Sequence, residues 1–227
     1  MTTASPLDPL NSPHPIPWNW VLATQTQASS ARTPRLRYYR TQALQSPDGC
    51  YAAYSRLQMQ VAAEFYQSRV SSTLFVENLE SGDLHTLTAT SPLADNLFHQ
   101  IERVERWGTI AILIPVAWSA MGNRLLAREF ESVFGSDIAS DYAVVWDRAA
   151  QQTVTLAPTG ISYTHAVLLG WSQCHPDRVL FRVGTLGEED WHCWTVDMTG
   201  QTELAEADQP QAFGKAVSNV WMGPQAS

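Results

Sequence analysis

Residues 109–130 read TIAILIPVAWSAMGNRLLAREF, which is a strongly apolar run, a turn in WSAMGN (118–123) and a second run, RLLAREF (124–130). A short apolar run that is bounded by turn residues is typical of a buried strand. The first run has about ten residues and contains Pro115, whereas a helix that spans a membrane needs about 20 apolar residues. We therefore expect a strand–turn–strand element here and no transmembrane segment in the chain.

The same order of elements, which is strand, turn, strand, loop, strand, tight turn and strand, occurs three times. The first turns are QSPDG (45–49), WSAMG (118–122) and WSQCHPD (171–177). The third strands are LFVENLESG (74–82), VVWDRAAQQ (144–152) and WTVDMTGQ (194–201), and the fourth strands are LHTLT (84–88), TVTLA (153–157) and TELA (202–205). The spacing of the units differs because residues 89–108 are extra, and this insertion is expected to include a short helical or irregular segment.

At these residues the chain resembles the TolB-like β-propeller repeat, also described as WD40-like. That family has a W-S-P-D-G turn after the first strand and a D-x-x-x-G turn after the third. Here SPDG is intact at 46–49, WS occurs at 118–119 and 171–172, and Gly82 and Gly200 occupy the later turn. The resemblance implies an all-β fold of three consecutive four-stranded antiparallel units, with a β-sandwich as the alternative.

Closed propellers typically have four to eight blades. Three units therefore imply an open, partial propeller, self-association that covers the exposed faces, or assembly against another chain. The terminal units of a repeat array need caps. The candidates for these caps are the N-terminal arm and the C-terminal strand with Val220 and Trp221.

The chain is expected to divide into a Pro-rich N-terminal arm (1–30), a three-repeat β domain (31–211) and a C-terminal strand or tail (212–227). Closely spaced prolines predict an extended arm, which either hangs free or docks on the body or on a partner. Trp18 and Trp20 would share one face of a strand and favour docking. Residues 212–223 are expected to open an unfinished fourth unit or to pair with residues 18–25.

Composition argues against several classes of protein. The chain has 14 basic and 22 acidic residues and a net charge of −8, without a basic run, which argues against nucleic acid as a partner. The N-terminus lacks the basic and apolar segments of a secretory signal, so a cytoplasmic location is expected. The three cysteines, Cys50, Cys174 and Cys193, are too sparse for a disulfide framework.

No sequence motif indicates a catalytic, metal or cofactor site. The six histidines are scattered without metal-ligand spacing, and neither a GxSxG elbow nor a phosphate-binding glycine loop is present. Ser119 and Ser172 are interpreted as turn residues that bond the turn backbone. The sequence therefore predicts a protein that is not an enzyme.

The nine tryptophans are the positive signal. Repeat positions pair Trp118 with Trp171 and Trp146 with Trp194, which indicates core packing. Five others have no repeat equivalent, and because tryptophan is enriched at interface hot spots they are the candidate partner-binding residues, with core burial as the alternative. These five are Trp18, Trp20, Trp107, Trp191 and Trp221.

Together these features predict a non-catalytic protein-binding scaffold, adaptor or assembly factor that binds a protein partner or self-associates. The alternative that the resemblance implies is a regulatory or accessory propeller domain of a hydrolase, or of an envelope-associated Tol-type system.

Overall fold

The computed structural model describes residues 8–28, 35–90, 108–218 and 220–225. The described part of the chain is all-β apart from one α-helix, α1 (Trp18–Ala28), and a short 3-10 helix, η1 (Phe65–Gln67). No helix in this part is both long and apolar enough to cross a membrane. The insertion at 89–108 lies almost wholly outside the described residues.

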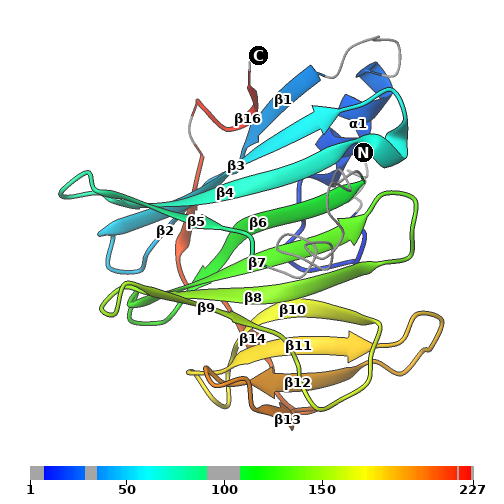
Figure 1. Cartoon of the computed structure of the whole chain (residues 1–227). Helices are drawn as coiled ribbons and strands as arrows, with labels where there is room; N and C mark the ends of the chain where they lie inside the picture. Colours follow the sequence, from blue (N-terminus) through cyan, green and yellow to red (C-terminus); the bar gives the residue numbers. More distant parts are fainter. Residues whose placement is uncertain (1–7, 29–34, 91–107, 219, 226–227) are drawn as a thin grey trace, which may run out of the picture.

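Three antiparallel units follow one another along the chain (Figure 1). The first unit consists of β2 (Ala43–Gln45), β3 (Tyr51–Val61), β4 (Arg69–Asn78) and β5 (Leu84–Thr88), with β1 (Arg35–Arg40) also paired to β3. The second unit consists of β6 (Thr109–Trp118), β7 (Arg124–Val133), β8 (Ala139–Asp147) and β9 (Gln152–Leu156). The third unit consists of β10 (His165–Ser172), β11 (Val179–Gly184), β12 (His192–Val196) and β13 (Thr202–Leu204).

The first two units join through a short parallel contact between β4 and β6, at Val70↔Ile110 and Ser71↔Ala111. Together with two C-terminal strands, β15 (Lys215–Val217) and β16 (Gly223–Gln225), the two units form one mixed 11-stranded sheet, whereas the third unit belongs to a separate 5-stranded antiparallel sheet. Neither sheet closes on itself within the described residues. The strands predicted for the three units are present, in the predicted order.

Side chains from adjacent units pack face to face. One core lies between the first and second units and contains Leu74, Trp118 and Trp146. A second core lies between the second and third units and contains Trp171 and Phe181. Each strand alternates its side chains between two faces, so the second unit, in the middle of the stack, packs against a neighbouring unit on each face. Trp118, Trp146 and Trp171 are at most 1% exposed, as the repeat positions predicted, and Trp194 is half-buried.

The first turn of each unit is closed by a serine, as interpreted for Ser119 and Ser172. In all three units the serine Oγ accepts a backbone N–H bond from a residue within the turn or at the start of the next strand. The acceptors are Ser46, Ser119 and Ser172, and the donors are the N–H groups of Tyr51, Arg124 and His175, at 2.9, 3.0 and 2.8 Å. The later turns are matched in the same way, because the side chains of Asn78, Asp147 and Asp197 each accept N–H bonds from the turn that follows.

Asp48, in the first turn, gives a testable dependence on pH. The Ser46 hydroxyl, the Cys50 N–H and the Arg148 guanidinium together lower its pKa from 3.8 to about 2. A carboxyl whose folded pKa is depressed stabilises the fold above its unfolded pKa, and this contribution is lost as the pH falls from about 4 to about 2. Because the side chain is one-third exposed, solvent screening reduces the contribution to about 1 kcal/mol.

We therefore expect Asp48→Asn to lower the free energy of unfolding by about 1 kcal/mol at pH 7. The difference from the wild type should be unchanged when urea unfolding is repeated at pH 5, above the unfolded pKa, and should shrink at pH 3. A difference that stayed constant over this range would show that ionisation of Asp48 contributes nothing.

Residues 18–28 form a helix, so the strand predicted for Trp18 and Trp20 is wrong. Helix α1 follows Pro17, whose carbonyl accepts the N–H groups of Trp20 and Val21 at 3.1 and 3.2 Å. Trp18, Val21 and Gln25 lie on one helical face, with the spacing of three and four residues that a helix requires. The two tryptophans gave an alternating pattern, but the buried positions of the helix are Val21, Thr24 and Gln25.

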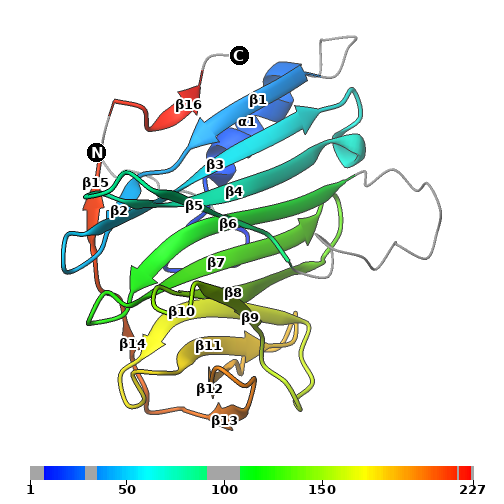
Figure 2. The same ribbon diagram turned by 60° about the vertical axis from the view of Figure 1, so that its left-hand side comes forward.

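The C-terminal strap, residues 209–218 and 220–225, runs back across all three units (Figures 1 and 2). Its strand β14 (Pro210–Gln211) pairs with β10, and Phe213 forms a bridge to Trp118 on β6. Strand β15 (Lys215–Val217) then pairs with β2, and β16 (Gly223–Gln225) pairs with β1. The strap therefore bonds to the first strand of each unit. The expected pairing with residues 18–25 is wrong because that segment is the helix.

The proposed cap residues of the strap do not act as caps, because Val220 is 90% and Trp221 is 63% exposed. The strap instead covers the edges of β10, β6 and β2 with its main chain. It approaches closely at Gly214, which has φ +110°, and a Cβ there would lie 2.8 Å from the Gln45 carbonyl oxygen.

Candidate functional site

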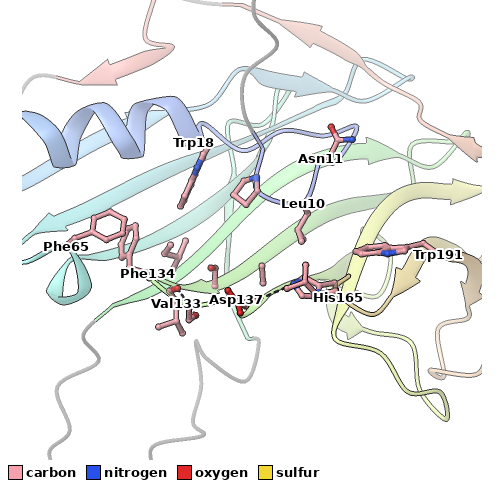
Figure 3. Close-up of a pocket in the computed structure, with 16 residues that line it drawn as sticks. Leu10, Asn11, Trp18, Phe65, Val133, Phe134, Asp137, His165 and Trp191 are labelled. Atoms are coloured by element: carbon pink, nitrogen blue, oxygen red, sulfur yellow. Dashed lines mark hydrogen bonds between the residues drawn. The ribbon is translucent and has the colours of Figure 1, made fainter. Parts of the chain in front are cut away.

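A cavity of about 460 Å³ lies between the N-terminal arm, the second unit and the third unit (Figure 3). The arm supplies Pro9 and Leu10, and helix α1 supplies Trp18. The β7–β8 turn and the β11–β12 turn form the other walls. The cavity is thus built from segments that are far apart in the sequence.

One wall is aromatic. The rings of Trp18 and Phe134 stack with centroids 6.3 Å apart and an interplanar angle of 24°. Phe65 meets Phe134 at 4.4 Å, and Phe130 meets Trp18 edge-on at 6.4 Å. Such clusters offer a rigid apolar surface for a guest side chain.

Trp191 forms the opposite wall and is fixed by its surroundings. Its ring lies against Gly184, where a Cβ would come within 2.5 Å of the indole Cγ. Its Nε1–H donates to the Glu188 carbonyl at 3.1 Å, and the His165 ring lies 6.1 Å away. A glycine at 184 is therefore required for Trp191 to occupy this position.

His165 is the titratable ring in the cavity, and both of its nitrogens are bonded to the protein. Nε2 lies 3.1 Å from the Asp137 carbonyl oxygen, so it must donate there. Nδ1 lies 2.7 Å from the Thr164 hydroxyl, which then donates to it. Because neither nitrogen is available to a substrate, His165 acts as a positioned wall of the cavity.

The arm that forms the roof of the cavity is held by a buried ion cluster. Arg128 and Asp141 are fully buried, and Arg128 Nε donates to Asp141 at 2.7 Å. The Arg128 guanidinium also binds both oxygens of Asp8, at 2.7 and 3.2 Å, and the His14 carbonyl at 2.6 Å. Leu10 and Ile16 of the arm are buried as well. The predicted arm therefore docks on the body over residues 8–17.

The pKa values of Asp8 and Asp141 shift in opposite directions, because a single guanidinium does not compensate two buried carboxylates equally. Burial opposes ionisation of Asp8, but Arg128 and the N–H groups of Ile16 and Ser12 outweigh it and lower the pKa of Asp8. For Asp141 burial is the larger effect, and its pKa rises to about 6 in spite of Arg128 and the Leu168 N–H. The two carboxylates raise the pKa of Arg128, which keeps its charge.

The structure brings together two of the five predicted tryptophans, Trp18 and Trp191, in this cavity (Figure 3). Trp20 packs on Tyr39 at 5.3 Å instead. Trp221 lies in the strap, away from the residues that line the cavity, and Trp107 lies outside the described residues.

Sequence reasoning missed Phe65, Phe134 and His165 as cavity residues, because loop aromatics and a single histidine carry no motif. Arg128 could have been found, since it occupies an inward position between Leu126 and Phe130 on an otherwise apolar face.

Among the described residues, no group of three or more His, Cys, Asp or Glu side chains is arranged to hold a metal ion. No known family model matches this chain, and no curated protein matches its sequence.

Proposed function

We propose that this protein is a non-catalytic protein-binding scaffold or adaptor, and that the cavity between its arm and its sheets receives an apolar side chain of the partner. The observation that carries the proposal is the pair of opposed aromatic walls, Trp18 with Phe134 on one side and Trp191 on the other. Aromatic-lined pockets of a few hundred Å³ accommodate the anchor residues of interfaces.

The rim of the cavity supports this proposal because it exposes large apolar side chains. Phe65 is 37%, Ile138 is 55% and Leu186 is 56% exposed. Phe65 and Leu186 line the cavity, and Ile138 lies between its lining residues Asp137 and Ala139. An apolar pocket with an apolar rim is typical of a surface that a protein partner covers. The bonded state of His165 favours binding over acid–base chemistry.

As the architecture behind this function we propose an open, partial β-propeller of three blade-like units. The face-to-face packing of the units, the matched serine turns and the matched Asn or Asp turns support it. The TolB-like resemblance of the turn motifs agrees with this architecture. In such an array the strap lies along the first strand of every unit, and the arm docks against residues of the second and third units.

Site-specific photo-cross-linking tests the function. A benzophenone amino acid at position 138, on the rim, should form an adduct of one defined mass in the native lysate. The same group at position 121, where Met121 is 81% exposed and does not line the cavity, serves as the control. Equal adducts from both positions would contradict the proposal.

A matched pair of substitutions sharpens this test. Leu186→Arg places a charge on the rim and should remove the adduct at position 138, because a desolvated guanidinium opposes an apolar contact. Leu204→Arg, at a residue of similar exposure (60%) on β13, should leave the adduct unchanged. If both variants gave the adduct at the wild-type level, the cavity would not be the binding site.

A further inference from the structure

The face of the first unit that points away from the second carries arginines stacked on aromatic rings. On β3, Ala53 and Leu57 face the cores, so Tyr54 and Arg56 point outward. The strand register puts Tyr38 and Arg40 of β1 on the same side, because they pair with Gln58 and Arg56. We refer to Tyr38, Arg40, Tyr54, Arg56 and Phe75 as the outer face.

The arginines of the outer face are held in place by the rings. The Arg40 guanidinium lies 3.8 Å from the centroid of Tyr54, and that of Arg56 lies 5.0 Å from the centroid of Tyr38. Tyr54 stacks in turn on Phe75 at 5.4 Å. A guanidinium that stacks through its plane keeps its N–H edge for an acceptor, and carboxylates fit that edge.

Within the described residues, neither Arg40 nor Arg56 forms an ion pair. Arg124, Arg128, Arg148 and Arg178 each pair with a carboxylate, whereas Arg37 and Arg182 share the lack of an ion pair within the described residues; what distinguishes Arg40 and Arg56 is that both stack on rings of the outer face. The outer face is therefore a net cationic surface, because its one carboxylate, Glu77, which shares the side of Phe75 on β4, forms no ion pair with Arg40 or Arg56. The larger acidic complement lies elsewhere in the molecule.

The complement is present at the other end of the molecule. Residues 165–208, which include the third unit, contain eight Asp or Glu and two Arg. Three of these carboxylates, Glu188, Glu189 and Asp190, lie side by side in the exposed β11–β12 turn, and their side chains form no hydrogen bond or ion pair with the described residues. We refer to residues 186–190 as the acidic turn.

The outer face and the acidic turn cannot meet within one molecule, because β1 and the third unit lie at opposite ends of the stack in both views (Figures 1 and 2). We infer that the outer face of one copy binds the acidic turn of a second copy. In a two-fold dimer of antiparallel copies each acidic turn lies on the outer face of the other copy, so both contacts form at once, whereas a head-to-tail arrangement of the same surfaces would extend into an open chain. The acidic turn begins at Leu186, which also lies on the rim of the cavity, so a second copy bound there would cover part of that rim. Glu188 and Glu189 do not line the cavity, and their charge reversal therefore tests this inference separately from the proposed function.

Light scattering on the purified full-length chain, separated by size exclusion, tests the inference. We expect the mass of a dimer at about 0.1 M salt and a shift toward the 25.2 kDa monomer at about 1 M, because the Debye length falls from about 10 to about 3 Å. A monomer at low salt at every concentration would overturn the inference.

Charge reversal makes the test specific. Glu188→Arg/Glu189→Arg should weaken the dimer about tenfold or more, and Arg40→Glu/Arg56→Glu should do the same. An equimolar mixture of the two variants should restore a dimer, because each cationic surface again meets an acidic one. Lys215→Glu, at an exposed residue of β15, is the control and should stay dimeric.

Two safeguards keep the outcome clear. If Arg40→Glu/Arg56→Glu does not fold by circular dichroism, Arg56→Glu alone replaces it, since Arg56 is exposed. The acidic-turn variant changes only exposed side chains. A dimer that survived reversal of the acidic turn, or a mixture that remained monomeric, would overturn the inference. Tight binding of a fluorescein-labelled single-stranded DNA that Arg56→Glu abolished would also overturn the inference, because the outer face would then be a nucleic-acid-binding surface.

Discussion

Arg128→Met is expected to lower the free energy of unfolding by about 3–5 kcal/mol, because it leaves two buried carboxyl groups without their cation. Asp8 and Asp141 both bond to Arg128, whose side chain has no exposure to solvent. Natural domains are stable by only about 5–15 kcal/mol, so the variant should be close to unfolding at 37 °C. Urea titration followed by tryptophan fluorescence measures the loss.

Arg124→Met is the matched control on the same strand. Arg124 pairs with Asp147 at 3.2 Å, but both side chains are about 30% exposed. Exposed pairs contribute about 0–1 kcal/mol, so this variant should unfold close to the wild type. If the two substitutions had equal effects, the buried cluster would not be what holds the arm on the sheets.

Removal of residues 210–227 is expected to destabilise the fold by about 3–6 kcal/mol, since several backbone hydrogen bonds of about 0.5–1.5 kcal/mol each are lost together. The deletion uncovers the edges of β10, β6, β2 and β1. Unpaired strand edges recruit other chains. The shortened protein should therefore also aggregate as its concentration rises, which light scattering detects.

The side chains of the strap provide the control for this deletion. Val217→Ser and Val220→Ser change residues that are 38% and 90% exposed and leave the backbone pairing intact. Both variants should keep wild-type stability and solubility. A soluble truncated protein of wild-type stability would show that the strap is dispensable for the fold.

The strands and their turns could be predicted from the sequence because the signals are local. Apolar runs and alternation between turn residues placed β3, β6 and β11 within one or two residues of their observed bounds. The serine of each first turn bonds a backbone N–H only three to five residues away. The local prediction failed at helix α1. Two tryptophans two residues apart fit the alternation of a strand, and only the further spacing of three and four residues to Val21 and Gln25 indicates a helix.

The candidate site could not be predicted in this way, because its parts meet only in the folded chain. Asp8 reaches Arg128 across 120 residues, and His14 reaches the Leu169 carbonyl across 155. No short-range pattern specifies which carboxylate a buried arginine selects. Of the five tryptophans singled out, tertiary packing brought Trp18 and Trp191 to one cavity and placed Trp20 against Tyr39.

By itself, therefore, the sequence determined that the chain is β-rich, that its units repeat and where its turns lie, since these depend on residue period and on contacts within a few positions. The tertiary structure alone decided that the arm docks, that the strap bonds to all three units and that an aromatic cavity forms between them. These features depend on contacts between segments that are distant in the sequence. Such contacts stabilise the chain only after the units have stacked and the entropy of closing the long loops between them has been lost.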